Sequence, residues 1–546
     1  MSQTRPQPDA SFDVVIVGAG FAGLYMLHRM RELGFRARVF EAGSGVGGTW
    51  YWNRYPGARC DVESLEYSYS FSEDLRKEWR WTERYATQPE ILRYLNHVAD
   101  RFDLRRDIQF DTKVTAATFD EERGCWTIAT DRGENVSAQF CVMATGCLSS
   151  AKVPDYKGLD SFQGKWYHTG HWPHEGVDFT GQTVAVIGTG SSGIQSIPQI
   201  ARQAAHLYVF QRTPNFSLPA RNAPLTSETL DDWHENAAKY REIAKSTPFG
   251  FLVQAGAPQT SALEVTAGER EQAYEKGWQQ GGFGTLVSFS DLFFKRESND
   301  TAAEFVRNKI RGIVRDPDVA EKLAPRDHPI GTKRACVDID YFETYNRDNV
   351  TLVDVRETPI EEITPAGPRT SERQFSVDSI VFATGFDAMT GALNAIAIRC
   401  REGYLKDKWA AGPRTYLGLM VAGFPNLFLI TGPGSPSVLS NMAISIEQHV
   451  DWISNCIAYL RNHGIASMEA DEDAETAWVN HVNEVGNMTL YPLANSWYVG
   501  ANIPGKPRVF MPYIGGLPAY CRKCNEVAAN GYEGFRLTPA ATAVTA

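Results

Sequence analysis

One pattern occurs twice in this 546-residue chain and constrains its fold more than any other feature: an apolar run, a glycine-rich turn and then a segment with helical spacing. In the first copy, the β-branched run from Asp13 to Gly20 is typical of a buried parallel strand that turns sharply. Phe21 to Leu33 has helical spacing, and Arg38 to Glu41 has the composition of a second strand. The first copy therefore predicts a strand, helix and strand of the kind that binds dinucleotides.

The second copy lies well beyond the first, near the end of the first third of the chain. It consists of the segments Thr183 to Gly190, Ile194 to Ala204 and Leu207 to Gln211. Two such copies predict an α/β fold with two Rossmann-like dinucleotide-binding domains. Between Thr226 and Pro325, charged amphipathic stretches with a period of about 3.6 residues predict a helical insertion. Strand patterns return at Ser379 to Ala383 and at Leu427 to Ile430.

The first glycine turn has the sequence Gly18-x-Gly20-x-x-Gly23 and opens a predicted helix. In that context the glycines let backbone N–H groups and the helix N-terminus approach a pyrophosphate. Glu41 stands at the end of the next predicted strand, where a carboxylate can accept the ribose hydroxyls. A glycine motif alone also fits an ordinary tight turn, but strand, helix and acid together favour dinucleotide binding.

The second glycine turn differs at the position that selects the nucleotide. Its glycines are Gly188, Gly190 and Gly193. Counted from the last glycine of each turn, the position that corresponds to Glu41 is Gln211, and Arg212 and Thr213 follow it. Loss of the acid removes repulsion of a ribose 2′-phosphate, and a guanidinium can bind that phosphate through two hydrogen bonds. We therefore predict NADPH rather than NADH; the alternative is that Arg212 is an ordinary solvated arginine at a strand end.

Two dinucleotide folds in one chain usually hold one bound flavin and one exchangeable nicotinamide, because hydride passes between the two cofactors. The first copy carries the acid and is predicted to bind FAD. We expect an FAD-binding domain from residues 1–150 and 386–546, the latter with substrate-pocket loops, and an NADPH-binding domain from residues 151–224 and 331–385. Residues 225–330 form the helical insertion. The loops at Ala144 to Gly146 and Ala383 to Gly385 should cross the two nucleotide sites.

Composition excludes several partners. The formal net charge is −11 and no basic block is present, which argues against nucleic acid. The apolar runs are far shorter than the roughly 18 residues of a membrane helix, and the N-terminal residues lack the pattern of a secretory signal. We expect a cytoplasmic monomer. The first eleven residues and Leu537 to Ala546 are small and polar enough to predict disorder.

Neither the cysteines nor the histidines predict a metal site. Nine scattered cysteines do not form a disulfide framework, and the close pair Cys521 and Cys524 lacks further ligands at zinc spacing. His168, His171 and His174 also complete no ligand set, and Pro173 interrupts any helix that would align them.

Two longer motifs carry a family resemblance. The pattern F-x-G-x-x-x-H-x-x-x-W-P is complete at Phe162, Gly164, His168, Trp172 and Pro173. A second pattern is complete at Gly47, Gly48, Trp50, Tyr55, Pro56, Gly57 and Asp61. With these motifs the chain resembles the flavin-dependent (type I) Baeyer–Villiger monooxygenases from about Asp13 to Leu537, and most closely their phenylacetone-oxidising branch.

The resemblance implies an NADPH- and O2-dependent enzyme that converts aryl or cyclic ketones to esters or lactones through a C4a-peroxyflavin. Arg334 matches the family's active-site arginine, and Asp61 matches the carboxylate that pairs with it. A fixed cation would stabilise the peroxide anion and the oxyanion of the ketone adduct, and a buried guanidinium needs such a partner. His168 and Trp172 lie on a linker and are implied to position the nicotinamide domain.

The resemblance also implies a set of binding residues. Beyond the two glycine turns, Glu41, Arg212 and Thr213, the cofactor contacts are Gly48, Trp50, Tyr55, Asp61, Thr189, Ser191, Ser192, Lys333 and Trp497. Trp497 is alternatively a core aromatic. The implied pocket residues are Leu148, Val438, Leu439 and Met511. Cys147 stands where the phenylacetone-oxidising branch has glutamine, and Val438 where it has alanine, so the ketone, the selectivity and the oligomeric state stay open.

Three other classes of flavoprotein share part of this sequence pattern. A flavin N- or S-hydroxylating monooxygenase shares both dinucleotide domains, but its histidine motif typically does not end in Trp-Pro. A disulfide reductase needs a CxxxxC pair near the first glycine turn, where only Cys60 occurs. A non-catalytic redox-sensing flavoprotein would oxidise NADPH slowly and form no ester.

Overall fold

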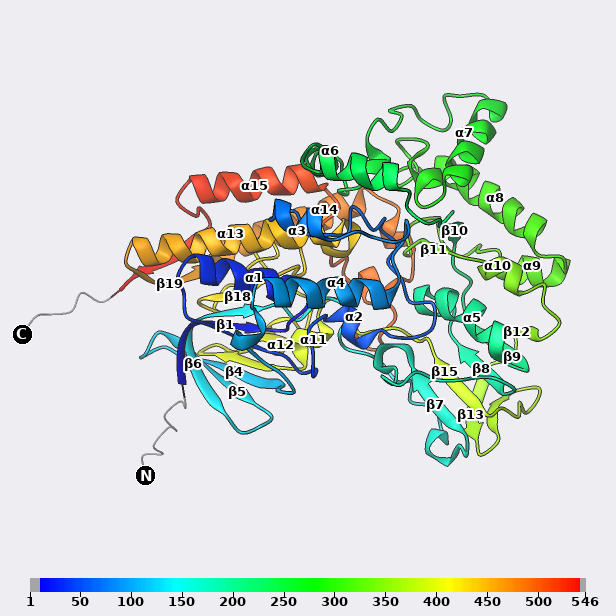
Figure 1. Ribbon diagram of the computed structural model, residues 1–546, viewed down its shortest axis with the longest axis horizontal. Helices are drawn as coiled ribbons and strands as arrows, with labels where there is room; N and C mark the ends of the chain where they lie inside the picture. The colour runs from blue at the N-terminus through cyan, green and yellow to red at the C-terminus, as the bar shows by residue number, and fades with distance from the viewer. Residues whose placement is uncertain (1–9, 541–546) are drawn as a thin grey trace, which may run out of the picture.

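The structure is a computed structural model that describes residues 10–540, and two β-sheets organise it (Figure 1). The first sheet has nine strands in the order β17-β16-β4-β5-β6-β1-β2-β3, with β18 beside β6. Its strands are β1 (Ala10–Val17), β2 (Ala37–Phe40), β3 (Ile108–Gln109), β4 (Val114–Asp120), β5 (Cys125–Thr130), β6 (Asn135–Met143), β16 (Ala397–Cys400), β17 (Gly403–Tyr404) and β18 (Leu427–Leu429). We call this sheet and the helices packed on it the first unit.

Both ends of the described chain contribute to the first unit. β1 runs parallel to β2 and β6, and Val14 and Ile16 are fully buried, which explains the unbroken apolar run. Its long helices are α1 (Phe21–Glu32), α4 (Gln88–Arg101), α13 (Met442–Asn462), α14 (Glu472–Asn487) and α15 (Leu517–Ala529). α1 packs on α13, where the Tyr25 hydroxyl donates to Asp451 Oδ1 at 2.7 Å. Segments from the beginning and the end of the sequence therefore form one hydrophobic core.

The second sheet is entirely parallel, in the order β12-β9-β8-β15-β7. Its strands are β7 (Lys165–His168), β8 (Thr183–Ile187), β9 (His206–Gln211), β12 (Val350–Asp354) and β15 (Ser379–Phe382). The helix α5 (Ser191–Gln203) connects β8 to β9, and a hairpin of β13 (Ile360–Thr364) and β14 (Gly367–Thr370) lies nearby. We call this sheet with α5 the second unit. The predicted fold class with two Rossmann-like sheets is confirmed.

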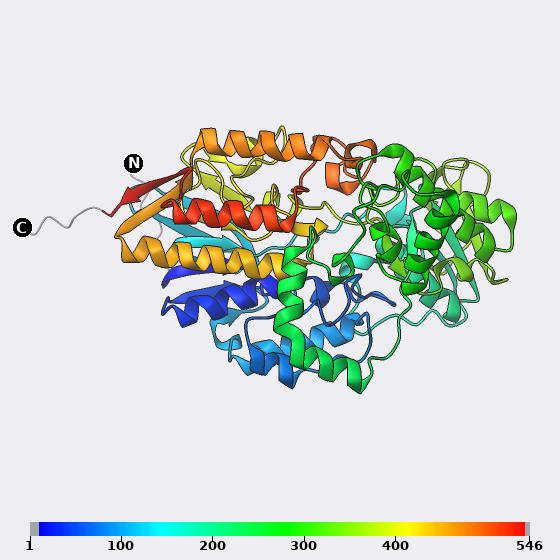
Figure 2. The same ribbon diagram turned by 90° about the horizontal axis from the view of Figure 1, so that it is seen from above.

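A helical insertion lies over the second unit and reaches the first. Its elements are α6 (Ser227–Ser246), η4 (Leu252–Gln254), α7 (Ala267–Gln280), η5 (Gly284–Val287), α8 (Arg296–Ile313) and α9 (Pro317–Leu323). At its base, β10 (Ser217–Pro219) pairs in parallel with β11 (Cys336–Asp338). Figure 2 shows α6 extending from the insertion across to the helices of the first unit, where Ala244 packs with Ile444 and Leu517. The insertion therefore connects the two units.

Shorter elements complete the described chain. They are α2 (Thr49–Trp52), α3 (Glu73–Glu78), α10 (Tyr341–Thr344), α11 (Gly391–Asn394), α12 (Leu405–Lys408), η1 (Arg105–Asp107), η2 (Leu159–Ser161), η3 (Thr169–His171), η6 (Ser437–Leu439), η7 (Tyr491–Leu493), η8 (Trp497–Val499), β19 (Ile465–Ala470) and β20 (Phe535–Pro539). Within residues 10–540, no helix is both long and apolar enough to cross a membrane.

The structure corrects three predictions. Ala10 and Ser11 pair with Val136 and Ser137 of β6, so the disorder predicted there is wrong for these two residues. The prediction is also wrong for residues 537–540, because residues 537–539 belong to β20, which pairs with β19, and the next N–H donates to the carbonyl of Gly464. The remaining terminal residues, 1–9 and 541–546, lie outside the described range. His168 ends strand β7 instead of lying on a linker, because pairing with β15 stabilises this short segment.

Candidate active site

The first glycine turn is packed so closely that larger residues do not fit. Gly18 has φ +103°, and a Cβ added to it would lie 2.6 Å from the carbonyl oxygen of Ala144. A Cβ on Gly23 would lie 1.8 Å from the Gly18 oxygen. A Cβ on Gly48 would lie 2.9 Å from the Gly20 Cα, so the second family motif packs directly on this turn. The expected loop at residues 144–146 therefore does lie against the first glycine.

Glu41 faces the same turn. Its carboxylate accepts hydrogen bonds from the N–H of Ala19 at 2.7 Å and of Gly43 at 2.8 Å. Burial raises the pKa of Glu41, and the backbone N–H groups partly oppose this. A buried acceptor held at a glycine turn in front of α1 fits the ribose and pyrophosphate of a dinucleotide.

The second glycine turn repeats this packing with one open position. A Cβ on Gly188 would lie 2.5 Å from the Ala383 oxygen, and one on Gly193 would lie 2.3 Å from the Gly188 oxygen. A Cβ on Gly190 would meet no described atom within 4 Å. The open space at the N-terminus of α5 fits a pyrophosphate that approaches the backbone. The Thr189 hydroxyl donates to the carbonyl of Thr213 at 3.0 Å and so connects the turn to the end of β9.

Two cations lie close together beyond β9. Arg212 is exposed, whereas the Lys333 side chain is 17% exposed. Burial lowers the pKa of Lys333, Asp327 at 4.0 Å raises it, and the charge of Arg212 lowers it. Such a pair suits a phosphate dianion. Gln211, by contrast, is buried and donates to the carbonyl of Lys322 at 2.7 Å, so its side chain is turned away from this place.

His168 connects β7 to the loop at residues 383–385. Its Nδ1 accepts from the N–H of Gly170 at 3.0 Å, and its Nε2 lies 3.3 Å from the Thr384 hydroxyl. That hydroxyl donates to the carbonyl of Lys152, so Nε2 carries the proton and donates. Burial lowers the pKa of His168 to about 4. A neutral, doubly hydrogen-bonded histidine holds the loop in place and is not suited to proton transfer at neutral pH.

The other residues of this motif are packing residues. A Cβ on Gly164 would lie 2.3 Å from the Asp378 oxygen and 2.5 Å from the Phe162 ring, so only glycine fits there. Trp172, followed by Pro173, is 4% exposed and lies in the core of the second unit with its ring 5.5 Å from that of Tyr167. Among the described residues, no group of three or more His, Cys, Asp or Glu could hold a metal ion.

A segment of the first unit reaches over α5. The Tyr55 hydroxyl donates to Gln195 Oε1 at 2.8 Å, and Gln195 Nε2 donates to the carbonyl of Arg59 at 3.0 Å. Trp50 Nε1 donates to the Tyr67 hydroxyl at 3.2 Å. The polar atoms of Tyr55 and Trp50, both expected at the cofactor, therefore have partners within the protein. This segment ends at Asp61.

Asp61 meets Arg334, as the resemblance implies. Arg334 Nε donates to Asp61 Oδ2 at 3.1 Å, and its Nη1 donates to the carbonyl of Val438 at 2.9 Å. Burial lowers the pKa of Arg334, but the Asp61 carboxylate outweighs it and holds the pKa above its usual range. Asp61 Oδ1 is buried without a partner among the described residues, which leaves an acceptor for a bound group.

The α5 N-terminus lies close to this ion pair. Ser191, which precedes Ser192 in the first turn of α5, places its hydroxyl 3.2 Å from the thiol of Cys336. Cys336 follows Arg334 by two positions. Arg334 therefore lies near the second glycine turn, and it also lines a cavity.

Arg334 lines a cavity of about 590 Å³ that is partly open to solvent. Val438 and Leu439, two of the four expected pocket residues, line it as well. Leu148 and Met511 do not, although both belong with Cys147 to the apolar cluster around it. Trp497 is half-buried against the same cluster, with its ring 4.2 Å from that of Tyr498.

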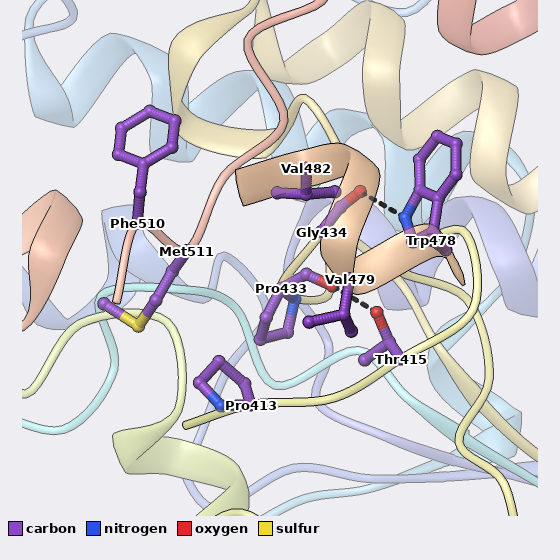
Figure 3. Close-up of a pocket in the computed structure, with 9 residues that line it drawn as sticks. All are labelled: Pro413, Thr415, Pro433, Gly434, Trp478, Val479, Val482, Phe510 and Met511. Carbon is purple, nitrogen blue, oxygen red and sulfur yellow. Dashed lines mark hydrogen bonds between the residues drawn. The ribbon is translucent and has the colours of Figure 1, made fainter. Parts of the chain in front are cut away.

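Met511 lines a second, smaller cavity of about 240 Å³ instead (Figure 3). Figure 3 shows Met511 beside Phe510, with Trp478 across the cavity and its Nε1 donating to the carbonyl of Gly434 at 3.0 Å. The lining is apolar apart from Thr415, whose hydroxyl is bonded to the carbonyl of Pro433 at 2.6 Å. The small volume and absence of charged lining residues among the described ones distinguish it from the Arg334 cavity.

Most residues that line the Arg334 cavity were not predicted from the sequence. The missed aromatic residues are Phe249, Phe251, Phe283, Phe293, Tyr491 and Tyr498. Four of them come from the insertion, where aromatics next to glycines in an otherwise charged region were an available signal. Hydrophobic and aromatic side chains predominate in the lining of ligand pockets.

Comparisons with known proteins agree with this geometry. The family described as "Pyridine nucleotide-disulphide oxidoreductase" matches residues 15–246. A "Baeyer-Villiger monooxygenase" of Pseudooceanicola batsensis is 45% identical and covers 96% of each chain. A phenazine N-monooxygenase of Lysobacter antibioticus is 41% identical over 96% of this chain and 97% of its own.

Solved structures match over nearly the whole chain. A steroid monooxygenase bound to NADP has a TM-score of 0.92 and 54% identity, and covers 97% of this chain and 100% of its own. A structure described as the OTEMO complex with FAD and NADP has a TM-score of 0.93 and 42% identity, with 98% and 100% covered. Similarity of this extent, together with the paired Asp61 and Arg334, shows that the chain belongs to the Baeyer–Villiger monooxygenase family.

Proposed function

We propose that this protein is an NADPH- and O2-dependent monooxygenase that converts aryl or cyclic ketones to esters or lactones. The observation that carries the proposal is a charged arginine, fixed by a buried carboxylate, on the wall of an apolar cavity. Membership of the family supports the reaction class. The narrower resemblance to the phenylacetone-oxidising branch stays a prediction.

FAD is proposed to bind the first unit. The glycine turn of Gly18, Gly20 and Gly23 would hold its pyrophosphate at the N-terminus of α1, and Glu41 would accept its ribose hydroxyls. NADPH is proposed to bind at the α5 N-terminus, where Gly190 leaves open space. When bound, the flavin supplies the activation of oxygen and the nicotinamide supplies the hydride.

Arg334 is proposed to bind the ketone oxygen. Its guanidinium would donate hydrogen bonds to that oxygen and stabilise the negative charge that develops on it during the reaction. Asp61 and the Val438 carbonyl fix the direction of the guanidinium, so little reorganisation is needed when the charge appears. The aromatic residues of the wall would reduce the contact of a bound ketone with water, which would strengthen the interaction.

The division of the chain follows the same reasoning. We propose residues 1–150 and 386–546 as the FAD-binding domain, residues 151–224 and 331–385 as the NADPH-binding domain, and residues 225–330 as the insertion. The support is that β1 to β6 and β16 to β18 share one sheet, whereas β7 to β9, β12 and β15 share the other.

We also propose a monomer that works in the cytoplasm. All nine cysteines are free thiols, as in proteins of a reducing compartment, and seven of them are buried. Size-exclusion chromatography with light scattering would test the monomer, and a dimer mass would contradict it.

One incubation series tests the reaction. The purified holoenzyme is given NADPH and a panel of aryl and cyclic ketones, and the products are identified by mass spectrometry. Esters or lactones that gain one oxygen atom are expected, and Arg334→Ala should retain bound flavin but form no ester. In a parallel incubation with an aromatic N-heterocycle, N-oxidation together with no ester from the ketones would favour the N-hydroxylating alternative, which the phenazine relative represents. Slow NADPH oxidation without product would favour a redox sensor.

A further inference from the structure

One wall of the cavity lined by Arg334 is hydrogen-bonded to a buried carboxylate that belongs neither to the Asp61–Arg334 ion pair nor to the proposed cofactor sites. Phe251, Val253 and Gln254 line the cavity from the insertion, around the short helix η4. The N–H of Leu252, the first residue of η4, donates to Glu66 Oε2 at 2.7 Å. Glu66 belongs to the first unit, shortly after Asp61 in the sequence, and is 7% exposed. The carboxylate thus joins one wall of the cavity to the segment that carries Asp61.

The backbone of Glu66 is fastened on the same side. Its carbonyl oxygen accepts from Asn441 Nδ2 at 3.0 Å and from Arg241 Nη1 at 3.4 Å. The N–H of Asn441 in turn donates to the carbonyl of Phe249, another lining residue, at 2.8 Å. The lining segment at residues 249–254 is therefore hydrogen-bonded to the first unit at its beginning, Phe249, and at its middle, Leu252.

Arg241 anchors this arrangement from helix α6. Its side chain is 9% exposed, it donates to the carbonyl of Ser68, and its Nη2 lies 3.5 Å from Glu447 Oε2 on α13. Glu447 accepts in addition from the hydroxyl of Ser70 at 2.6 Å. Burying charged groups costs free energy unless they are paired and hydrogen-bonded. Here the Leu252 N–H bond to Glu66 and the bonds made by Arg241 join the insertion to the first unit beside the cavity.

We propose that Glu66 is a positioning residue of the ketone site, which fixes the lining segment at residues 249–254 and so sets the width of the cavity for large ketones. The inference rests on the proposed function, because it concerns the same cavity. A small ketone needs contact with Arg334 and little of this wall, whereas a bulky aryl ketone also packs on Phe251 and Val253. Loosening the segment should therefore weaken binding of bulky ketones selectively.

The first test compares two substitutions of Glu66 by steady-state kinetics. Glu66→Ala removes the acceptor, so we expect the KM of a bulky aryl ketone to rise roughly tenfold. The KM of NADPH and of a small cyclic ketone should change by less than about twofold, because neither is expected to contact the lining segment at residues 249–254. Glu66→Gln keeps an acceptor oxygen for the Leu252 N–H and should restore the wild-type KM. Glu63→Ala, which removes a neighbouring carboxylate paired with Arg84, is the matched control and should leave all three values unchanged.

The second test removes the donor. Leu252→Pro deletes the N–H at the first position of a helix, where proline is tolerated, and Phe251 already has the extended conformation that a following proline requires, φ −118° and ψ 134°. Leu252→Ala keeps the N–H and is its control. We expect Leu252→Pro to raise the KM of the bulky ketone as Glu66→Ala does, and the double variant to add nothing further.

Hydrogen exchange tests the anchoring without any reaction. Backbone amides of residues 249–254 should exchange faster in Glu66→Ala and Leu252→Pro than in the wild type, Glu66→Gln or Leu252→Ala. Unchanged exchange, or equal KM changes for small and bulky ketones, would overturn the proposal. If Glu66→Ala fails to fold, Leu252→Pro carries the test alone. Absence of ester from the wild type would refute the proposed function, whereas the exchange result would still decide the anchoring.

Discussion

Three side chains near the end of β9, those of Gln211, Arg212 and Lys333, are the ones proposed to decide which nicotinamide nucleotide binds. The spacing predicts Gln211 and Arg212 at the end of β9, the position that corresponds to Glu41 after β2 in the first copy. In the structure, the Gln211 amide donates to the Lys322 carbonyl and is buried, so it contributes by its neutrality and not by contact. Arg212 and Lys333 are therefore the side chains proposed to bind the 2′-phosphate. The spacing of residues in the sequence does not show that the Gln211 amide binds the Lys322 carbonyl, because this contact depends on how distant segments pack together.

This placement predicts the cofactor preference. Wild-type enzyme should prefer NADPH to NADH by more than tenfold in kcat/KM, about 1.4 kcal/mol or more. Arg212→Ala should reduce the preference by removing the cation, whereas Gln211→Ala should preserve it. The measurement is NADPH and NADH oxidation with a good ketone. Equal use of both nucleotides by the wild type would refute the assignment of the phosphate site.

A second prediction for a single residue concerns Asp61, the partner of Arg334. Asp61→Ala leaves the half-buried guanidinium of Arg334 without its carboxylate partner, which costs up to several kcal/mol and is relieved when the arginine moves or water enters. Ester formation should fall by at least about tenfold, while surviving NADPH consumption yields hydrogen peroxide. Asp61→Glu keeps the charge and should retain some activity. NADPH, hydrogen peroxide and ester are measured together, and a normal ester yield in Asp61→Ala would contradict the pairing.

Elements with a strong local signal were predicted, and those that depend on distant partners were not. The apolar run before Gly18 and the periodic charged stretches of the insertion appear as β1 and α6 to α8. The antiparallel strands β4 and β5, and β7 before His168, have short or mixed patterns and form because neighbouring strands pair with them. The cavity wall was missed for the same reason, since residues near 250, 330 and 490 meet only in the folded chain.

Two of the three glycines of the second turn predict different effects of a change to alanine. A Cβ at Gly193 would meet the Gly188 oxygen at 2.3 Å, so Gly193→Ala should lower the free energy of unfolding by about 1–3 kcal/mol. Gly190 faces open space, so Gly190→Ala should keep the stability within about 0.5 kcal/mol but raise the KM of NADPH. Denaturant unfolding and NADPH titration check the pair. FAD content, which should not change in Gly190→Ala, is the control.

The stability of the whole molecule should depend on pH through His168, whose ring accepts a hydrogen bond within the second unit only while it is neutral. His168 has a pKa of about 4 in the folded protein, below its ordinary value of 6.5, so the unfolded chain takes up a proton first as the pH falls. Its contribution to stability is therefore present above pH 6.5 and is lost between pH 6.5 and about 4. His168→Asn keeps an acceptor for the Gly170 N–H without titrating.

This predicts a shallower loss of stability in acid for the variant. The free energy of unfolding is measured by denaturant titration at several pH values from 8 to 4. At pH 8 the variant should be no more stable than the wild type, and the difference between them should shrink or reverse toward pH 4. Parallel pH curves for the two proteins would contradict the role given to His168. His206→Asn, at a histidine bonded to Thr351, is the control.

Along the sequence, all strands of the second sheet lie between β6 and β16 of the first sheet. This order has a consequence for synthesis on the ribosome. Every strand of the second sheet has been translated once Phe382 is made, whereas the first sheet still lacks β16 to β18, which end at Leu429, and α13, which covers α1. The N-terminal glycine turn is thus made first, yet the helix that packs beside it is made only after the whole second sheet. A nascent chain can therefore complete the second unit, which is proposed to bind NADPH, before the first unit, which is proposed to bind FAD. We expect flavin to bind only at the last stage of biogenesis, and a chain truncated before β16 to be unable to retain it.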